Sequence, residues 1–256
     1  MTAFSCASGS GPHVALVTCA AYAELDVDDR DLIPALRAQG VAPRIAIWND
    51  PQVPWHQCDY VILRSTWDYS QDLQAFLAWA GSLQGVTTLA NSLEIIEWSA
   101  DKHYLGDLAS AGVPVVDTQF IEPGDRYALP SRQFVVKPTV SAGSRNTYRF
   151  SPDRIAEAAL SINDIHALGK TVMIQPYLES VDTSAETAMV FFDGSFSHAA
   201  RKGALLGLDD QDHNYENGLF IREHVTAREP RPDQLEVARA ALGCAPSGWL
   251  YARVDL

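Results

Sequence analysis

The feature that most constrains the fold is an alternation of short apolar runs with helical segments between residues 13 and 92. Residues 13–17 and 60–63 have the length and apolar content of buried strands. Residues 28–39 and 73–80 instead carry their apolar side chains at helical spacing. Strands that alternate with helices predict a parallel sheet covered on both faces. The further strands expected in this part are residues 44–48 and 87–90.

The pattern changes after residue 92, where strands, helices and a hairpin are mixed. The dipeptide Asp193-Gly194 lies between two apolar runs, and this is a strong hairpin signal. Such a mixture predicts an α+β domain rather than a second doubly wound sheet. The strands expected here are residues 133–137, 171–175 and 249–256, and the helices are residues 153–166 and 234–242.

The change of pattern also predicts how the chain is divided. Ser99 is expected to cap a helix that continues through Lys102 to Gly112, which would open the second domain. The three parts expected are a disordered leader over residues 1–12, an α/β domain over residues 13–92, and an α+β domain over residues 93–256.

The balance of charges excludes several classes of partner. Lys and Arg total 19 and Asp and Glu total 32 among the 256 residues, which gives a formal net charge of −13. A protein that binds nucleic acid or a membrane surface would show a basic face, so we expect neither partner. The four cysteines show no C-x-x-C spacing, which favours reduced thiols in a cytoplasmic protein over a zinc site or a disulfide framework.

The lysines are the first residues that suggest a chemistry. The chain has only four of them, and Lys102, Lys137 and Lys202 lie in or beside apolar segments. An ammonium at the end of a buried strand needs an anionic partner, because an unpaired buried charge is costly. A triphosphate is one such partner, and a nearby Asp or Glu is the alternative.

The loop after Lys137 is the second such feature. Ser141, Ala142, Gly143 and Ser144 are small, so their amides and hydroxyls could wrap phosphate oxygens, and Arg145 follows them. The alternative is a simple turn. The loop is not a Walker loop, because no G-x-x-x-x-G-K-[ST] pattern occurs in the chain.

Two further segments complete the pattern. The strand that runs into Gln175–Glu179 can offer backbone groups to an adenine, and Glu179 or Glu186 can accept from ribose hydroxyls. Arg253 and Asp255 are two apart on a strand and therefore share a face. There they could serve a metal–phosphate centre. The alternatives are solvated surface acids and a simple strand-face ion pair.

Taken in this order, these residues resemble the ATP-grasp ligases, and within them the branch of the O-ureido-serine cyclo-ligase of D-cycloserine biosynthesis. The resemblance covers nearly the whole chain after the leader. It implies a Rossmann-like parallel-sheet domain followed by an ATP-grasp fold of two subdomains. The segments that carry it are residues 61–69, 98–105, 135–138, 141–145, 196–202 and 251–255.

The resemblance also implies ATP and Mg²⁺ as cofactors, and it implies a role for each matching residue. The phosphates would be bound by Lys102 and Lys137 under a flap that contains Ser141, Gly143, Ser144 and Arg145. The adenosine would be bound by Gln175, Tyr177, Leu178, Glu179 and Glu186. The transferred phosphoryl and the substrate carboxylate would be contacted by Arg201, Lys202 and Arg253, and the magnesium by Asp255. The amino-acid part of the substrate would be contacted by Arg64, Ser65 and Asp68, unless these polar residues only cap the following helix.

The function expected is therefore an ATP-dependent ligase that joins a small amino-acid-like carboxylate to a nitrogen through an acyl phosphate. Cyclisation and ordinary amide formation both remain open, and so does assembly as a homodimer. Two alternatives from other classes are a nucleotide-binding module without catalysis and a nucleotide-free binding protein with structural lysines.

The end of the chain carries an expectation of its own. Residues 249–256 form a strand pattern that stops at Leu256 with no turn residue after it. An open apolar strand is an edge that pairs with other chains, so compact domains seldom end on one. The resemblance places further acidic metal ligands on a following strand. We therefore expect a truncated chain with an incomplete metal site.

Overall fold

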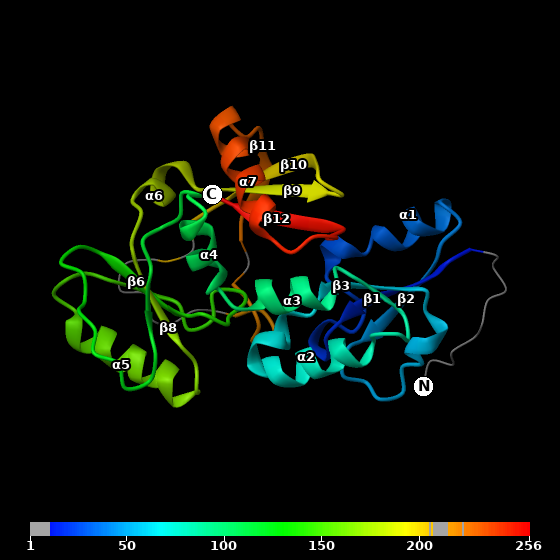
Figure 1. The fold of residues 1–256 in the computed structure, drawn as a ribbon, viewed down its shortest axis with the longest axis horizontal. Coiled ribbons are helices and arrows are strands. Elements are labelled where there is room, and N and C mark those ends of the chain that lie inside the picture. Colours follow the sequence, from blue (N-terminus) through cyan, green and yellow to red (C-terminus); the bar gives the residue numbers. More distant parts are fainter. Residues whose placement is uncertain (1–10, 205, 207–214, 222) are drawn as a thin grey trace. The chain divides into compact units, whose positions relative to one another are not determined.

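The computed structural model describes residues 11–204, 206, 215–221 and 223–256, and it divides into two compact units, Met1–Leu93 and Glu94–Leu256 (Figure 1). The first unit holds a four-stranded parallel sheet of order β2-β1-β3-β4. The predicted parallel sheet is thus confirmed. Its strands are β1 (His13–Thr18), β2 (Ala42–Ile47), β3 (Tyr60–Ser65) and β4 (Thr88–Ala90).

The helices of the first unit follow the apolar spacing, but the first of them begins later than the sequence predicts. The Asp26 side chain accepts a hydrogen bond from Asp28 N at 3.0 Å and caps a short 3₁₀ turn, so α1 (Leu32–Ala38) starts only after it. Asp72 caps α2 (Leu73–Ser82) in the same way, through Ala75 N. The other 3₁₀ turns are Ala20–Tyr22, Trp55–Gln57 and Trp67–Gln71.

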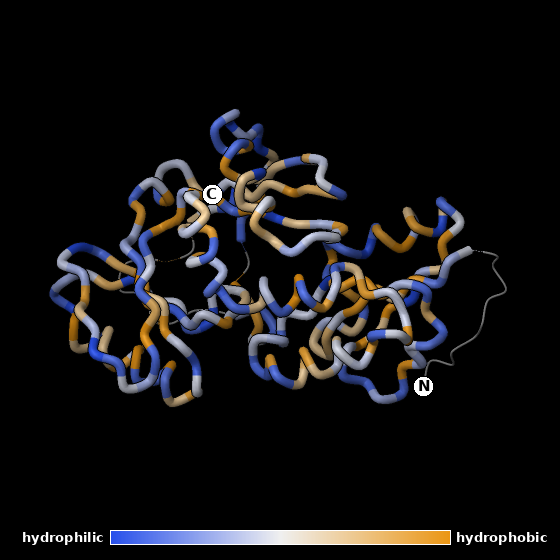
Figure 2. The backbone as a smooth tube through the Cα atoms, viewed as in Figure 1, coloured by the Kyte–Doolittle hydropathy of each residue, from blue (hydrophilic) through white to orange (hydrophobic). Residues whose placement is uncertain are grey.

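The second unit contains two four-stranded sheets, and apolar segments concentrate along their strands (Figure 2). One sheet is antiparallel, has the order β5-β8-β6-β7 and packs against α5 (Ile155–Ala167). The other is antiparallel, has the order β11-β10-β9-β12 and packs against α7 (Pro232–Cys244). The strands are β5 (Gln119–Ile121), β6 (Phe134–Pro138), β7 (Tyr148–Phe150), β8 (Val172–Pro176), β9 (Glu186–Phe192), β10 (Ser195–Lys202), β11 (Val225–Arg228) and β12 (Tyr251–Asp255).

The predicted hairpin is confirmed between β9 and β10. Asp193 and Gly194 form its turn with φ angles of 44° and 77°. Two successive positive φ angles give a turn whose twist matches that of the strands, and Asp-Gly is a favoured pair for it. The hairpin brings Glu186 opposite Lys202 at its far end.

The helix expected from Ser99 to Gly112 is wrong in its boundaries. Ser99 lies inside α3 (Leu93–Ala100), and α4 (Tyr104–Ser110) begins after a break. At the break, Lys102 N bonds to Thr139 O at 3.1 Å, so this backbone group is used by the end of β6 and not by a helix. The remaining short helix of this unit is α6 (Ser180–Ser184). Among the described residues, no helix has both the length and the apolar content needed to cross a bilayer.

We expect Ile162→Ala to lower the free energy of unfolding by about 2–5 kcal/mol, because this side chain is fully buried in the core beneath α5. Leu160→Ala on the same helix is the matched control. Leu160 is 63% exposed, so its removal should cost less than about 0.5 kcal/mol. Urea denaturation followed by circular dichroism measures both values. Equal losses would show that the buried face of α5 is assigned wrongly.

Candidate functional site

Lys102 lies in the break between α3 and α4, and its side chain reaches the end of β6. Its ammonium donates to Thr139 O at 3.1 Å, Ser141 O at 3.0 Å and Ser141 Oγ at 3.1 Å. These three acceptors are uncharged, so they orient the ammonium without neutralising it. The amine therefore stands at the start of the small-residue loop that follows Lys137.

Three lysines gather at this place. Burial, together with the charges of Lys137 and Lys170, lowers the pKa of Lys102 to about 8 against the opposing effect of Asp101. Burial also lowers the pKa of Lys137, with Glu186 opposing. Among the described residues, the Lys137 ammonium forms no hydrogen bond or ion pair with a protein group. The cluster thus has more cations than nearby carboxylates, which is a suitable environment for a polyanion.

The small-residue loop is held against a second loop, residues 215–221. Gly143 has a φ of +60°, and a Cβ built on it would lie 2.2 Å from Phe220 Cβ. Its carbonyl accepts from Ile221 N at 3.3 Å. Only glycine allows this approach, because any side chain here would meet the backbone of the other loop. The remaining contacts are Arg145 Nη1 to Gly218 O at 2.6 Å and Tyr215 Oη to Ser144 O at 3.4 Å.

In the segment after β8, one backbone amide is hydrogen-bonded within the protein and the next one is open. Tyr177 N donates to Gln133 O at 2.8 Å, whereas Leu178 N has no acceptor among the described residues. The Tyr177 ring is covered by the Arg149 guanidinium at 3.5 Å, and its hydroxyl donates to Asp182. The other predicted residues here are Gln175, whose Nε2 donates to Thr118 Oγ1 at 2.8 Å, and Glu179, which is exposed just before α6.

A second charged cluster surrounds Lys202 at the end of β10. Its ammonium lies 3.1 Å from Glu223 Oε2, 3.3 Å from Asp255 Oδ2 and 3.5 Å from Glu186 Oε2. Arg253 forms a two-bond pair with Asp255, from Nε at 2.8 Å and from Nη2 at 3.0 Å. Three carboxylates therefore face two cations, which is the opposite balance from the Lys102 cluster.

Asp255 is the predicted magnesium ligand. Burial raises the pKa of its carboxyl, but Arg253 and Lys202 outweigh burial and hold the pKa below its usual range. The ionised oxygens are the ligands that Mg²⁺ prefers. Among the described residues, no group of three His, Cys, Asp or Glu side chains could hold a metal ion by itself. The residues present fit an ion that takes one protein carboxylate and fills its other positions with phosphate oxygens and water.

Arg201 is not brought to the Lys202 cluster. Neighbouring residues on a strand point to opposite faces. Arg201 pairs with Thr187, on the face where Ala199 belongs to the core packed against α7, whereas Lys202 pairs with Glu186 on the other face. The register therefore places Arg201 and Lys202 on opposite faces of β10.

The three predicted substrate residues lie in the first unit and do not form one group. Arg64 Nε donates to Asp29 Oδ1 at 3.0 Å, and Ser65 Oγ donates to Asp29 Oδ2 at 2.9 Å. Asp68 instead accepts from Trp48 Nε1 at 2.9 Å, and burial raises its pKa. Arg64 and Ser65 are thus held by one buried carboxylate at the carboxyl end of β3.

Sequence reasoning missed four residues of these clusters. Asp29 follows the first strand, so it lies near the carboxyl edge where such sheets bind ligands, and that position was a usable signal. Glu223 lies just before β11, a strand that the sequence did not predict. Arg149 likewise lies on the unpredicted β7, and nothing in the pattern marks it. Tyr104 follows Lys102 closely, and burial together with the charge of Asp255 raises its pKa.

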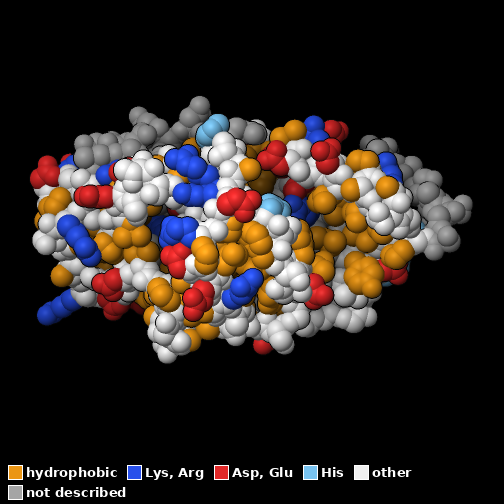
Figure 3. Space-filling view, turned by 90° about the horizontal axis from the view of Figure 1, so that it is seen from above, with side chains coloured by type: hydrophobic (Ala, Val, Ile, Leu, Met, Phe, Trp, Pro, Cys, Tyr) orange, Lys and Arg blue, Asp and Glu red, His pale blue; other side chains and the backbone are white. Residues whose placement is uncertain are grey.

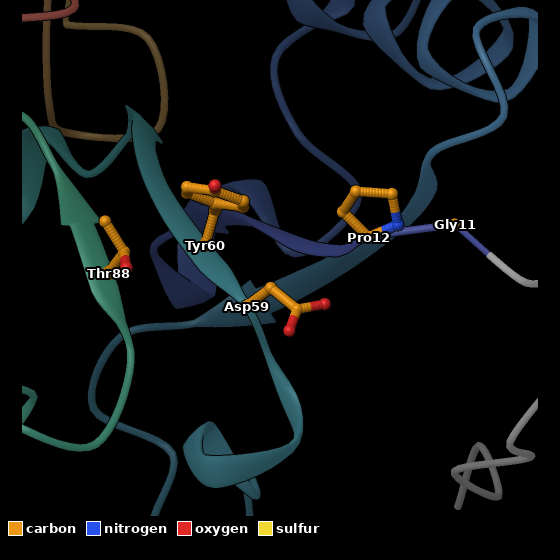
Figure 4. A pocket seen from close by; sticks show the side chains of 5 residues that line it. All are labelled: Gly11, Pro12, Asp59, Tyr60 and Thr88. Atoms are coloured by element: carbon orange, nitrogen blue, oxygen red, sulfur yellow. The ribbon is translucent and has the colours of Figure 1, made fainter.

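A depression of about 520 Å³ lies at the amino ends of β1, β3 and β4, at the opposite edge of the sheet from Arg64 (Figure 4). It is open, and the side chains of its lining residues do not converge on one point. The Asp59 carboxylate there accepts from His13 N at 2.7 Å. The depression is therefore not a candidate site. The residues that line the depression are Gly11, Pro12, Asp59, Tyr60 and Thr88.

On the face shown in Figure 3, basic and acidic side chains are interspersed.

We expect Gly143→Ala to separate the two loops, because alanine costs about 1–2 kcal/mol in the left-handed region and its Cβ would overlap Phe220. Hydrogen exchange of residues 215–221 should become faster in this variant. Gly169→Ala is the matched control, since Gly169 has a φ of +69° with no atom within 4 Å of its built Cβ. Identical exchange in both variants would contradict the contact.

Comparison with known proteins adds a family model and close relatives. Residues 14–91 match the model of the N-terminal domain of D-cycloserine synthetase DcsG. The chain is 36% identical over 242 residues to the cycloserine biosynthesis protein DcsG of Streptomyces lavendulae, which covers 91% of this chain and 79% of that protein.

Solved structures agree with this similarity. The crystal structure of D-cycloserine synthetase DcsG matches with a TM-score of 0.83 at 34% identity, over 95% of this chain and 86% of the other. D-alanine–D-alanine ligase of Bacillus anthracis, crystallised with ATP, matches with a TM-score of 0.67 at 14% identity, over 96% and 81% of the two chains. The predicted fold is confirmed.

Proposed function

We propose, because this chain belongs to the ATP-grasp ligase family of D-cycloserine synthetase DcsG, that it activates a small amino-acid-like carboxylate with ATP and joins it to a nitrogen. That the chain is an ATP-grasp ligase follows from the family. The acyl phosphate, the substrate and the residue roles are the proposal. The observation that carries them is the gathering of Lys102 and Lys137 beside the loop that contains Gly143.

The nucleotide would be bound along this part of the second unit. Lys102 and Lys137 would neutralise phosphate oxygens, and the loop of Ser141, Gly143, Ser144 and Arg145 would cover them. Leu178 N is the open donor for an adenine edge, since Tyr177 N is already bonded to Gln133 O. Gln175, Tyr177 and Arg149 would shape the wall beside it, and Glu179 or Glu186 would accept from the ribose.

The chemistry takes two steps. A carboxylate oxygen of the substrate attacks the γ-phosphorus, the bond to the β,γ-bridging oxygen breaks, and ADP leaves. A nitrogen then attacks the acyl carbon, the bond to the phosphate oxygen breaks, and the nitrogen loses a proton as inorganic phosphate departs. The chain would mainly position the reactants and balance developing charge. Lys202 and Arg253 are the residues we assign to the transferred phosphoryl, and not Arg201, which lies on the other face.

Mg²⁺ would be held by Asp255 together with phosphate oxygens. When bound, it would offset the negative charge of the phosphates. Arg253 keeps the Asp255 carboxylate ionised and fixes its orientation through two hydrogen bonds.

The amino-acid part of the substrate is assigned to the carboxyl edge of the first unit's sheet. Arg64 would contact a carboxylate, with its guanidinium held by Asp29, which in turn accepts from Ser65 Oγ. Asp68 remains a candidate for the substrate's ammonium. The name of the Streptomyces lavendulae relative favours a substrate that carries its own nitrogen, so that the product is a ring. We also propose the division at residues 92 and 93 as the border between the substrate-side and nucleotide-side domains.

The direct test incubates the chain with MgATP and a panel that includes O-ureido-serine and D-alanine. We expect ADP release with O-ureido-serine and a ring product by mass spectrometry. Lys137→Ala should reduce kcat/KM for ATP about 100-fold, because a charged contact to phosphate is lost. Arg239→Ala, on the exposed side of α7, is the control. No ADP release with any carboxylate, together with unchanged ATP affinity in Lys137→Ala, would rule the function out.

ATP binding should take up protons near pH 8. The pKa of Lys102 is about 8 in the folded chain, so about half of this amine is neutral there. A triphosphate beside it favours the ammonium and raises the pKa, so a proton must be bound. Calorimetry in buffers of different ionisation enthalpy measures the uptake. It should decline below pH 7, where the amine is already charged, and it should be lost in Lys102→Met.

The same amine gives the free chain a pH dependence of stability. Its pKa is 10.5 in the unfolded chain and about 8 in the folded one, so the unfolded chain binds more protons between these values. The free energy of unfolding should therefore rise from pH 8 to pH 10.5 by a contribution that Lys102→Met lacks. A contribution that falls over this window would contradict the burial of the ammonium.

A further inference from the structure

We propose that Glu223 is a positioning residue that holds the Lys202 ammonium in line for the transferred phosphoryl, an inference that rests on the proposed function. Its carboxylate lies 3.1 Å from Lys202 Nζ, the shortest of the three carboxylate contacts in that cluster. None of the roles that the family resemblance implies falls on Glu223.

The register of the sheet explains why Glu223 reaches Lys202. Lys202 pairs with Val225 across the antiparallel ladder of β10 and β11, and Gly203 N continues the ladder by donating to His224 O at 3.2 Å. Residues two apart share a face, so Glu223 lies on the same face as Val225 and diagonal to Lys202. The contact between Glu223 and Lys202 therefore follows from the register of the two strands.

The other two carboxylates of the Lys202 cluster differ from Glu223 in their contacts and exposure. Asp255 is held by Arg253 through two hydrogen bonds. Glu186 is the most exposed of the three, with 44% of its side chain accessible, whereas Glu223 has 25%. Among the described residues, the only ion pair of Glu223 is with Lys202. Glu223 is thus the carboxylate whose removal takes an ion-pair partner from Lys202 and leaves the hydrogen bonds between Arg253 and Asp255 in place.

Charge balance gives the direction of the effect. Glu186, Glu223 and Asp255 face Lys202 and Arg253, so the cluster carries one surplus negative charge where a triphosphate would approach. Without Glu223 this surplus is removed and the ammonium is freer to move. ATP should then bind more tightly while the phosphoryl transfer becomes slower, because the cation is no longer aligned. A residue that only supported the fold would weaken both.

The test compares Glu223→Gln, Glu223→Asp and the control Glu229→Gln, which makes the same charge change at an exposed glutamate outside the cluster. Calorimetry measures the Kd of ATP and of ADP, and ADP release with O-ureido-serine gives kcat. In Glu223→Gln we expect the Kd of ATP to fall about threefold, the Kd of ADP to stay the same, and kcat to fall about tenfold. Glu223→Asp should recover most of kcat.

The outcomes separate the two proposals. If the unaltered chain releases no ADP with any carboxylate, the ligase function fails, and the ATP and ADP affinities still decide the role of Glu223. If Glu223→Gln weakens ATP and ADP equally, or if it behaves like Glu229→Gln, the positioning role is overturned. In Lys202→Met, adding Glu223→Gln should change kcat little, because the group that Glu223 positions is absent, whereas the Kd of ATP should still fall because a negative charge is removed. Full additivity of the two changes in kcat would also overturn the positioning role.

Discussion

The hydrogen bonds of the Lys102 ammonium to Thr139 O, Ser141 O and Ser141 Oγ organise the part of the second unit where we propose that the nucleotide binds. They tie the break between α3 and α4 to the end of β6, where Lys137 projects. Because all three acceptors are neutral, they fix the amine in place and leave its charge available. A carboxylate at the same position would have cancelled the field that a polyphosphate needs.

The two charged clusters differ in a way that suits their different tasks. Around Lys102 and Lys137 the cations exceed the nearby carboxylates, so this part is suited to holding phosphates. Around Lys202 and Arg253 the carboxylates exceed the cations, so each positive group already has a defined direction. The roles proposed for phosphate binding and for alignment therefore fall on different residues, although Glu186 faces Lys202 and also acts on Lys137.

Sequence periodicity predicted the parallel sheet and the β9–β10 hairpin, because both have long apolar runs or a specific turn pair. It did not predict β7 or β11, which have three and four residues and too little alternation to stand out. Glu223 was missed for that reason, since its place is defined by the register of β11. Ser99 was misjudged because a tertiary hydrogen bond from Lys102 N to Thr139 O interrupts the helix. The lysines were found early because their scarcity made each one informative.

That scarcity has a consequence for handling the molecule. All four side-chain amines belong to the second unit, and all four lie in the two clusters described above. Acylating dyes and amine-directed cross-linkers will therefore modify this unit and leave the lysine-free first unit without a side-chain label. A fluorophore or a solid support intended to spare nucleotide binding is better attached through a thiol than through an amine.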